Sequence, residues 1–169
     1  MNPKLTRIWD MITTALVALV VVIAVFLAGS RLVGYRVFNV VSGSMEPAYS
    51  VGDLLYVKAV DPDSVKVGQP ITFVLNEELV VATHRVSAID SENRQFFTKG
   101  DANKTEDASP VHFNNLIGVP VFAIPLLGYV SAYIQSSPGM YVAIGFGVAL
   151  LAAVFLPELL TKKKKQNTP

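Results

Sequence analysis

The sequence predicts a mainly β protein, in which a small β domain is flanked by N- and C-terminal transmembrane helices. Two observations lead to this prediction. A long apolar run lies near each end of the chain, and between these runs short stretches of β-forming residues alternate with turn residues. The composition agrees: 51% of the 169 residues are hydrophobic and only 16% are charged, which is too apolar for an ordinary soluble domain.

The first apolar run extends from Met11 to Gly29 without a charged residue, and predicts a transmembrane helix over 11–30. Lys4 and Arg7 lie in the preceding segment 1–10, and the positive-inside rule assigns that segment to the cytoplasm. The alternative is a cleaved signal peptide with a small-residue exit at 28–30. The length of the run and the presence of a second run favour a retained anchor.

The second apolar run extends from Met140 to Leu156, and predicts a transmembrane helix over 139–157 that Pro157 closes. The tail 158–169 follows with four consecutive lysines at 162–165, which belong on the cytoplasmic face. The two charge patterns agree with each other. They predict a two-pass membrane protein with both termini in the cytoplasm and the segment 31–138 on the extracytoplasmic face.

The segment 31–138 is expected to form the β domain. The expected strands are Val37–Val41, Leu54–Val60, Pro70–Leu75, Leu79–Ile89, Gln95–Lys99 and Ile117–Ala123, and the turns between them include Asn76-Glu77-Glu78. The stretch Val119–Ile134 contains two prolines and a glycine. We interpret it as a last strand and a turn at the membrane surface, with a re-entrant segment as the alternative.

Charge and cysteine content exclude several classes of function. The segment 31–138 contains 8 basic and 11 acidic residues, a net charge of 8 − 11 = −3, which gives no support to nucleic-acid binding. The chain has no cysteine, which excludes a thiol nucleophile, disulfides and cysteine-ligated metals.

A candidate nucleophile lies in Ser42-Gly43-Ser44-Met45-Glu46-Pro47, just after the first expected strand. Side chains two residues apart share one side of an extended chain, so Ser42 and Ser44 are expected to face one site. The alternative is an ordinary serine turn. A serine hydroxyl becomes a good nucleophile only when a nearby base accepts its proton.

The chain has two histidines that could supply this base. His84 lies in a strongly β-forming run, which would hold it rigidly, whereas His112 lies in a turn and is expected at the surface. Either Asp101 or Asp107 could accept the Nδ1 proton of His84 and so orient the ring. Spacing alone does not choose between the two aspartates.

Three motifs together resemble the type I signal peptidase family. They are Ser42-Gly43-Ser44-Met45-Glu46-Pro47 with Gly52-Asp53, His84-Arg85-Val86, and Lys99-Gly100-Asp101-Ala102-Asn103. Histidine at the base position resembles the ER-type branch, found in the eukaryotic endoplasmic reticulum, archaea and some Gram-positive bacteria. The eukaryotic form generally has one N-terminal anchor, so the second span and the lysine tail favour a bacterial or archaeal plasma membrane. The resemblance implies the catalytic residues Ser44 (nucleophile), His84 (base), Asp107 (partner of the base) and Asp101 (support). It also implies an oxyanion site formed by the Ser44 N–H and the Ser42 hydroxyl.

The resemblance further implies a membrane-bound serine endopeptidase that removes signal peptides from exported preproteins after small residues, at Ala-x-Ala sites. No metal or cofactor is expected. The implied partners are preprotein signal peptides, the lipid bilayer and the secretion translocon. Candidate walls of the substrate site are Phe38 and Val40, which could equally be core residues, together with Val81 and Thr83. The alternative function is an inactive membrane-anchored β domain that binds or scaffolds secretory partners.

Overall fold

The computed structural model describes residues 3–75 and 80–166, and it divides into two compact units that we describe separately. One unit combines the two ends of the chain, Met1–Ala28 and Tyr133–Pro169, and the other is the continuous segment Gly29–Ala132. The predicted turn Asn76-Glu77-Glu78, and Leu79 at the start of one expected strand, lie outside the described residues.

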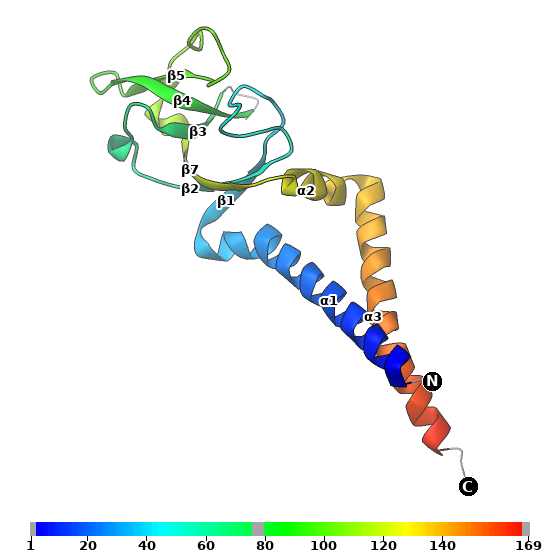
Figure 1. Ribbon diagram of the computed structural model, residues 1–169. Helices are drawn as coiled ribbons and strands as arrows, with labels where there is room; N and C mark the ends of the chain where they lie inside the picture. Colours follow the sequence, from blue (N-terminus) through cyan, green and yellow to red (C-terminus); the bar gives the residue numbers. More distant parts are fainter. Residues whose placement is uncertain (1–2, 76–79, 167–169) are drawn as a thin grey trace. The chain divides into compact units, whose positions relative to one another are not determined.

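The segment Gly29–Ala132 is built on one seven-stranded sheet, in which every pair of neighbouring strands is antiparallel (Figure 1). The strand order across the sheet is β1-β2-β7-β3-β4-β5-β6. The prediction of a mainly β fold is therefore confirmed. The strands are β1 (Tyr35–Asn39), β2 (Leu54–Lys58), β3 (Pro70–Val74), β4 (Val81–Asp90), β5 (Gln95–Lys99), β6 (Val111–His112) and β7 (Leu116–Ile124).

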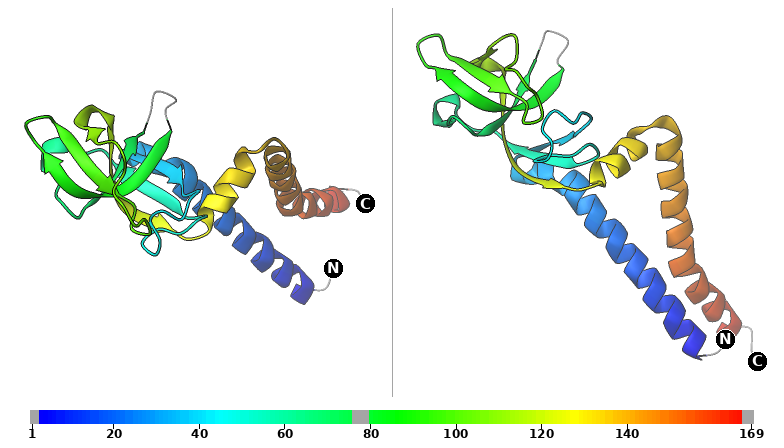
Figure 2. Two further views of the ribbon diagram at one scale, coloured as in Figure 1. Left: turned by 90° about the horizontal axis from the view of Figure 1, so that it is seen from above. Right: turned by 45° about the horizontal axis from the view of Figure 1, so that its top comes forward.

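Strand β7 joins the two halves of this sheet. Its later residues, Val119–Ile124, pair with β2, whereas its first residues, Leu116 and Gly118, pair with β3. Register shifts interrupt both pairings, and such irregularities increase the local twist. The sheet is therefore curled rather than flat (Figure 2).

The main hydrophobic core includes side chains from β3, β4 and β5. Ile71 and Phe73 on β3 are fully buried, and Phe96 on β5 stacks on Phe113 with ring centroids 4.3 Å apart. Burial of each such side chain contributes about 1.5–3 kcal/mol. Odd-numbered residues of β3 face this core. In the β3–β4 register Ile71 is opposite His84, so the same core supports the candidate base.

Most strand predictions agree with the structure to within two residues at each end, and β5 agrees at both ends. The two-residue strand β6 was not predicted, because so short a segment has no detectable periodicity.

One prediction for this unit is wrong. The stretch after β7 is not only a strand and a turn, since it continues as helix α2 (Leu127–Gln135). In the sequence, Pro125 and Gly128 indicate a break in any helix. In the structure Pro125 lies before the start of α2, and close packing requires a glycine at position 128. A Cβ atom on Gly128 would lie 2.5 Å from the main-chain oxygen of Asp53.

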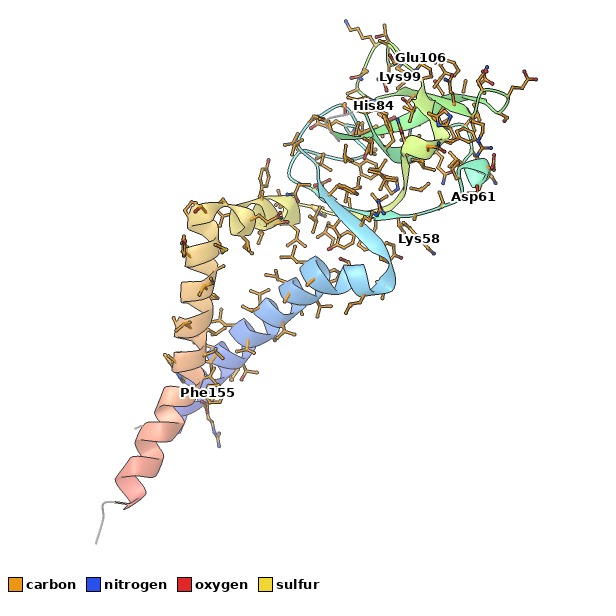
Figure 3. All side chains as sticks on the ribbon, turned by 180° about the vertical axis from the view of Figure 1, so that it is seen from behind. Lys58, Asp61, His84, Lys99, Glu106 and Phe155 are labelled. Atoms are coloured by element: carbon orange, nitrogen blue, oxygen red, sulfur yellow. The ribbon has the colours of Figure 1, made fainter. Side chains whose placement is uncertain are left out.

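The other unit contains helix α1 (Pro3–Ala28) and helix α3 (Ser137–Gln166). The stretches Arg7–Ala28 and Ser137–Phe155 are long and apolar enough to cross a membrane, judged by length and composition. Their large apolar side chains are mostly exposed: Phe155 on α3, labelled in Figure 3, is 56% exposed. Within this unit the Trp9 indole donates a hydrogen bond to the Ala153 carbonyl at 3.2 Å.

The prediction that Pro157 closes the second apolar helix is wrong, because α3 continues through it to Gln166. A proline within a helix removes one main-chain donor and crowds the preceding turn. A long helix can accept this as a local kink instead of an end. Helix α1 likewise starts earlier than the apolar run, at Pro3.

Candidate active site

Ser44 lies in the loop that connects β1 to β2, and main-chain hydrogen bonds close this loop at its base. The Val40 N–H donates to the Asp53 carbonyl at 2.9 Å, and the Gly52 N–H donates to the Val40 carbonyl at 2.9 Å. The carboxylate of Asp53 accepts from the Ser50 N–H at 2.9 Å. The Gly52-Asp53 motif therefore fixes the two ends of the loop that carries Ser44.

Ser42 and Ser44 are neighbours, although not for the reason expected from the sequence. Strand β1 ends at Asn39, and residues 42–49 form bends and turns instead of extended chain. The turn places the two Oγ atoms 3.4 Å apart. The two hydroxyls therefore face one site, as expected, but a turn brings them together and the prediction that they lie on an extended strand is wrong.

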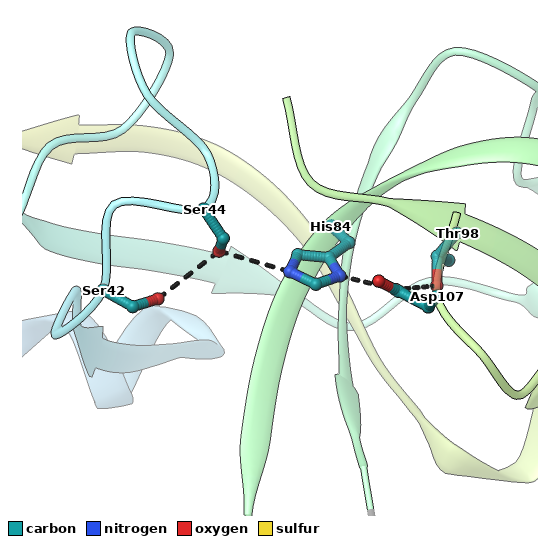
Figure 4. Close-up of polar contacts among 5 residues, drawn as sticks. All are labelled: Ser42, Ser44, His84, Thr98 and Asp107. Carbon is teal, nitrogen blue, oxygen red and sulfur yellow. Dashed lines mark hydrogen bonds and ion pairs between the residues drawn. The ribbon is translucent and has the colours of Figure 1, made fainter. Parts of the chain in front are cut away.

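His84 lies on β4, where both ring nitrogens have side-chain partners (Figure 4). Its Nε2 is 3.2 Å from Ser44 Oγ, and its Nδ1 is 2.5 Å from Asp107 Oδ2. The ring meets the Phe73 ring edge-on, with centroids 6.2 Å apart. The side chains of His84 and Asp107 are only 15% and 19% exposed. The serine, the histidine and one aspartate thus form a continuous line of polar contacts.

The two candidate aspartates have different partners. Asp107 contacts His84, whereas Asp101 forms a bidentate pair with Arg85, at 2.7 Å to Nε and 2.6 Å to Nη2. The hydrogen bonds from Arg85 lower the pKa of Asp101, and the bond to Asp101 raises the pKa of Arg85. Arg85 also donates from Nη1 to the Gly68 carbonyl at 2.8 Å.

The loop that carries Asp101 also contacts the main chain of Ser44. The Ala102 N–H donates to the Ser44 carbonyl at 2.9 Å. A Cβ atom on Gly100 would lie 2.6 Å from that same carbonyl oxygen, so this position requires glycine. Asp101 is therefore linked to Ser44 through its own loop, and not through the histidine.

A groove of about 430 Å³ opens beside Ser44 and His84. Its lining includes all four of the candidate substrate-site residues: Phe38, Val40, Val81 and Thr83. The Thr83 hydroxyl lies 2.8 Å from that of Thr72. Strand β4 pairs with β5 only from Arg85 onward, so in the described part of the sheet residues 81–84 pair only with β3. The other edge of β4 is open along the groove, and an open edge can bind an extended peptide.

Several residues at the site were given no individual role from the sequence, among them Ala82, Arg85, Thr98 and Asn103, although Arg85 and Asn103 stand in the motifs quoted above. Ala82 and Asn103 line the groove, and Ala82 lies on the same face of β4 as His84. The Thr98 hydroxyl donates to Asp107 Oδ2 at 2.7 Å (Figure 4). Alternation along β5 could have indicated Thr98, because it follows Phe96 by two residues and therefore shares its buried face.

The second histidine, His112, has a different hydrogen-bond partner and does not line the groove. His112 is exposed, and its Nδ1 accepts a hydrogen bond from the Asn114 N–H at 3.1 Å, which caps a short 3₁₀ turn. Among the residues that the structure describes, no group of three or more His, Asp or Glu side chains could hold a metal ion. The chemistry available at the groove is that of a hydroxyl, an imidazole and carboxylates.

Comparison with known proteins gives this arrangement a family. No protein-family model matches the chain. The signal peptidase complex catalytic subunit SEC11 of Komagataella phaffii is 36% identical over 141 residues, which cover 73% of this chain and 77% of that protein. Signal peptidase I W of Bacillus subtilis is 38% identical over 86 residues, and human SEC11C is 37% identical over 71.

The lengths of these alignments differ. The matched residues make up 49% of this chain and 45% of the Bacillus protein, so the chain spans about half the length of that relative, and the human match covers 37% of SEC11C. The Komagataella alignment covers more than two thirds of both chains. The chain therefore belongs to the type I signal peptidase family, in its ER-type branch.

Proposed function

We propose that the chain is a membrane-bound serine endopeptidase that removes signal peptides from exported preproteins. The observation that carries this proposal is the line of contacts from Ser44 through His84 to Asp107, which borders an open groove. The names of the relatives support the same activity.

In the proposed mechanism Ser44 is the nucleophile and His84 is the general base. With Nδ1–H donating to Asp107, the Nε2 lone pair faces Ser44 and accepts the proton of its hydroxyl as Oγ attacks the scissile carbonyl. The imidazolium, stabilised by Asp107, then gives this proton to the leaving amine. A water molecule activated in the same way hydrolyses the acyl-enzyme.

The negative oxygen of the tetrahedral intermediate needs donors that are already in place. We assign this role to the Ser44 N–H and the Ser42 hydroxyl. The Ser42 hydroxyl lies 3.4 Å from the nucleophilic oxygen, close enough to reach an oxyanion formed there.

The substrate in this proposal is an extended peptide that adds to the open edge of β4 before His84. Main-chain hydrogen bonds along this edge would give affinity, and the walls of the groove would limit side-chain size. Phe38, Val40, Val81 and Thr83 are the proposed walls, to which we add Ala82. Their proximity to Ser44 favours small residues, as at Ala-x-Ala sites. The secretion translocon is a further partner in this proposal.

The family and the two apolar helices indicate a membrane protein. For its topology we propose two membrane crossings, with both termini in the cytoplasm and the β unit on the extracytoplasmic face of the plasma membrane. Lys4 and Arg7 before one span and the lysines after the other support this orientation. A membrane-bound enzyme meets its substrates at a raised effective concentration.

The experiment that tests the function uses the full chain in detergent and a preprotein with an Ala-x-Ala site. Wild type should cleave after that site, and Ser44→Ala should not. Cleavage that survives in Ser44→Ala would reject the mechanism. A wild type that binds the preprotein without cleaving it would indicate the scaffold instead.

The natural absence of cysteine allows the topology to be tested separately. Ser64→Cys lies on the exposed surface of the β unit, and a cysteine added after Pro169 marks the other end. A membrane-impermeant maleimide applied to intact cells should label the first and not the second. The opposite pattern would reverse the proposed orientation.

A further inference from the structure

Thr98 is a polar side chain at a position where the fold would accept an apolar one. It is 1% exposed and shares the inner face of β5 with fully buried Phe96. Its partner in the sheet register is Val86, another buried core residue. A hydroxyl in such a place is costly unless it has a hydrogen-bond partner. That partner is the carboxylate of Asp107.

Thr98 holds Asp107 through two separate hydrogen bonds. Its hydroxyl donates to Oδ2 at 2.7 Å, and its main-chain carbonyl accepts from the Asp107 N–H at 2.9 Å. The first fixes the carboxylate, and the second fixes the main chain that bears it. Both start from a residue in the rigid core of the sheet, so the loop position of Asp107 depends on a strand.

The Thr98 hydroxyl and His84 Nδ1 meet the same carboxylate oxygen, as Figure 4 shows. A carboxylate oxygen has two lone pairs, and Oδ2 uses one for each donor. Rotation of the carboxylate would break both contacts together. The hydroxyl therefore keeps Oδ2 directed at the imidazole, and through it keeps the proton on Nδ1 and the lone pair on Nε2.

We infer that Thr98 is a positioning residue for the proposed catalytic set, acting through Asp107 to fix the orientation and tautomer of His84. This inference rests on the proposed function, because it assigns His84 the role of base. Thr98 touches neither the groove lining nor Ser44 among the described contacts, so its effect is on turnover rather than on substrate affinity.

The test compares Thr98→Val, which keeps the shape and removes the hydroxyl, with Thr98→Ser, which keeps the hydroxyl. In Thr98→Val kcat should fall about tenfold to a hundredfold with KM nearly unchanged, the size of loss seen when an outer-shell partner of a metal-bound histidine is removed. The acidic limb of the pH profile should also move. Thr98→Ser should restore most of the activity. Thr98→Ala removes the same hydroxyl and replaces the valine variant if that does not fold.

Thr72→Val is a matched control, because Thr72 is also a fully buried strand threonine with one hydroxyl partner, in this case Thr83. It should lose stability to a similar degree without moving the pH profile. An equal movement in both variants would mean that a general loosening of the sheet is responsible, and would overturn the inference.

A spectroscopic readout separates this inference from the proposed function. The chain has two histidines, so ¹⁵N-histidine labelling gives two ring spectra, and His112→Gln assigns them. In wild type the His84 ring should show a protonated Nδ1 and an unprotonated Nε2, and in Thr98→Val this pattern should become mixed. Unchanged ring shifts and unchanged kcat in Thr98→Val would overturn the inference. If wild type did not cleave at all, the proposed function would fail, and the ring shifts would still decide the role of Thr98.

Discussion

Asp107 and Asp101 lie six residues apart in one loop, yet their carboxylates are used in different ways. Asp107 contacts a histidine whose other nitrogen faces Ser44, whereas Asp101 is paired with the permanently charged Arg85. The comparison teaches that the local contacts of a carboxylate decide its role: Asp107 contacts the proposed base, and Asp101 holds two segments of the chain together.

The two partners are adjacent on β4. Successive strand residues point to opposite faces, so His84 and Arg85 contact the loop that carries Asp101 and Asp107 from opposite faces of β4. The Arg85–Asp101 pair positions the loop whose Ala102 N–H binds the Ser44 carbonyl. The proposed nucleophile and the proposed base are thus placed relative to each other by an ion pair that takes part in neither proton transfer.

The largest expected effect comes from breaking the line through His84. His84→Ala removes the only imidazole beside Ser44 in the described structure, and kcat should fall about 10⁶-fold. The loss of kcat is measured with purified full-length protein and a preprotein substrate. His112→Ala is the control, and it should keep its activity. A small effect of His84→Ala would reject its role as base.

The next effect concerns the oxyanion site. Ser42→Ala should lower kcat about 10²–10³-fold, because one fixed donor to the developing negative charge is lost. KM should remain near the wild-type value. The exposed Ser91 offers a control for serine-to-alanine replacement at a surface turn. Equal activity of Ser42→Ala and wild type would reject the proposed role of the Ser42 hydroxyl as an oxyanion donor.

Breaking the other pair should affect stability more than chemistry. Arg85→Gln leaves Asp101 without its charged donors, and should cost about 1–2 kcal/mol of unfolding free energy, since the pair is partly exposed. The thermal midpoint from near-ultraviolet circular dichroism of the tyrosines reports it. Lys66→Gln is a surface control. A loss of kcat approaching that of His84→Ala, at unchanged stability, would contradict the division of roles.

The smallest effect is the pH dependence that follows from Asp101. Its pKa is lowered in the folded protein by hydrogen bonds from Arg85, so its stabilising contribution is present above the unfolded-state pKa. That contribution is lost as pH falls through the lower folded-state pKa. Unfolding midpoints measured on acidification should therefore fall less steeply in Asp101→Asn than in wild type. Parallel curves would contradict the lowered pKa of Asp101 in the folded protein.

Much of the fold could be predicted because its signals are local. The strand Gln95–Lys99 has bulky residues bounded by a turn and by Gly100, and its bounds agree with the structure. Helix α2 could not be predicted, because its early glycine is required by contact with the distant residues Gly52 and Asp53. The continuation of α3 through Pro157 depends on the tolerance of a long helix for one lost hydrogen bond.

The site was predictable in residue type but not in its contacts. Ser44 and His84 could be named from their motifs. Spacing alone left both aspartates open as partners of the histidine, and the family resemblance favoured Asp107, which is the one that contacts His84. The choice depends on the β4–β5 register, which sets Arg85 opposite Lys99 and so brings Asp101 to Arg85. Thr98 belongs to no motif. Its contacts with Asp107 form only because the loop brings the Asp107 main chain back beside β5.

The most direct test compares kcat for Asp107→Asn and Asp101→Asn near neutral pH, in full-length protein with a preprotein substrate. Both changes remove one negative charge and keep the side-chain shape. Asp107→Asn should lower kcat about 10⁴-fold, because the amide favours the wrong histidine tautomer. Asp101→Asn should lower it by about tenfold or less, with reduced stability, since it acts only through the loop. Equal losses, or the larger loss in Asp101→Asn, would contradict the assignment of Asp107 as the partner of His84, the proposed base.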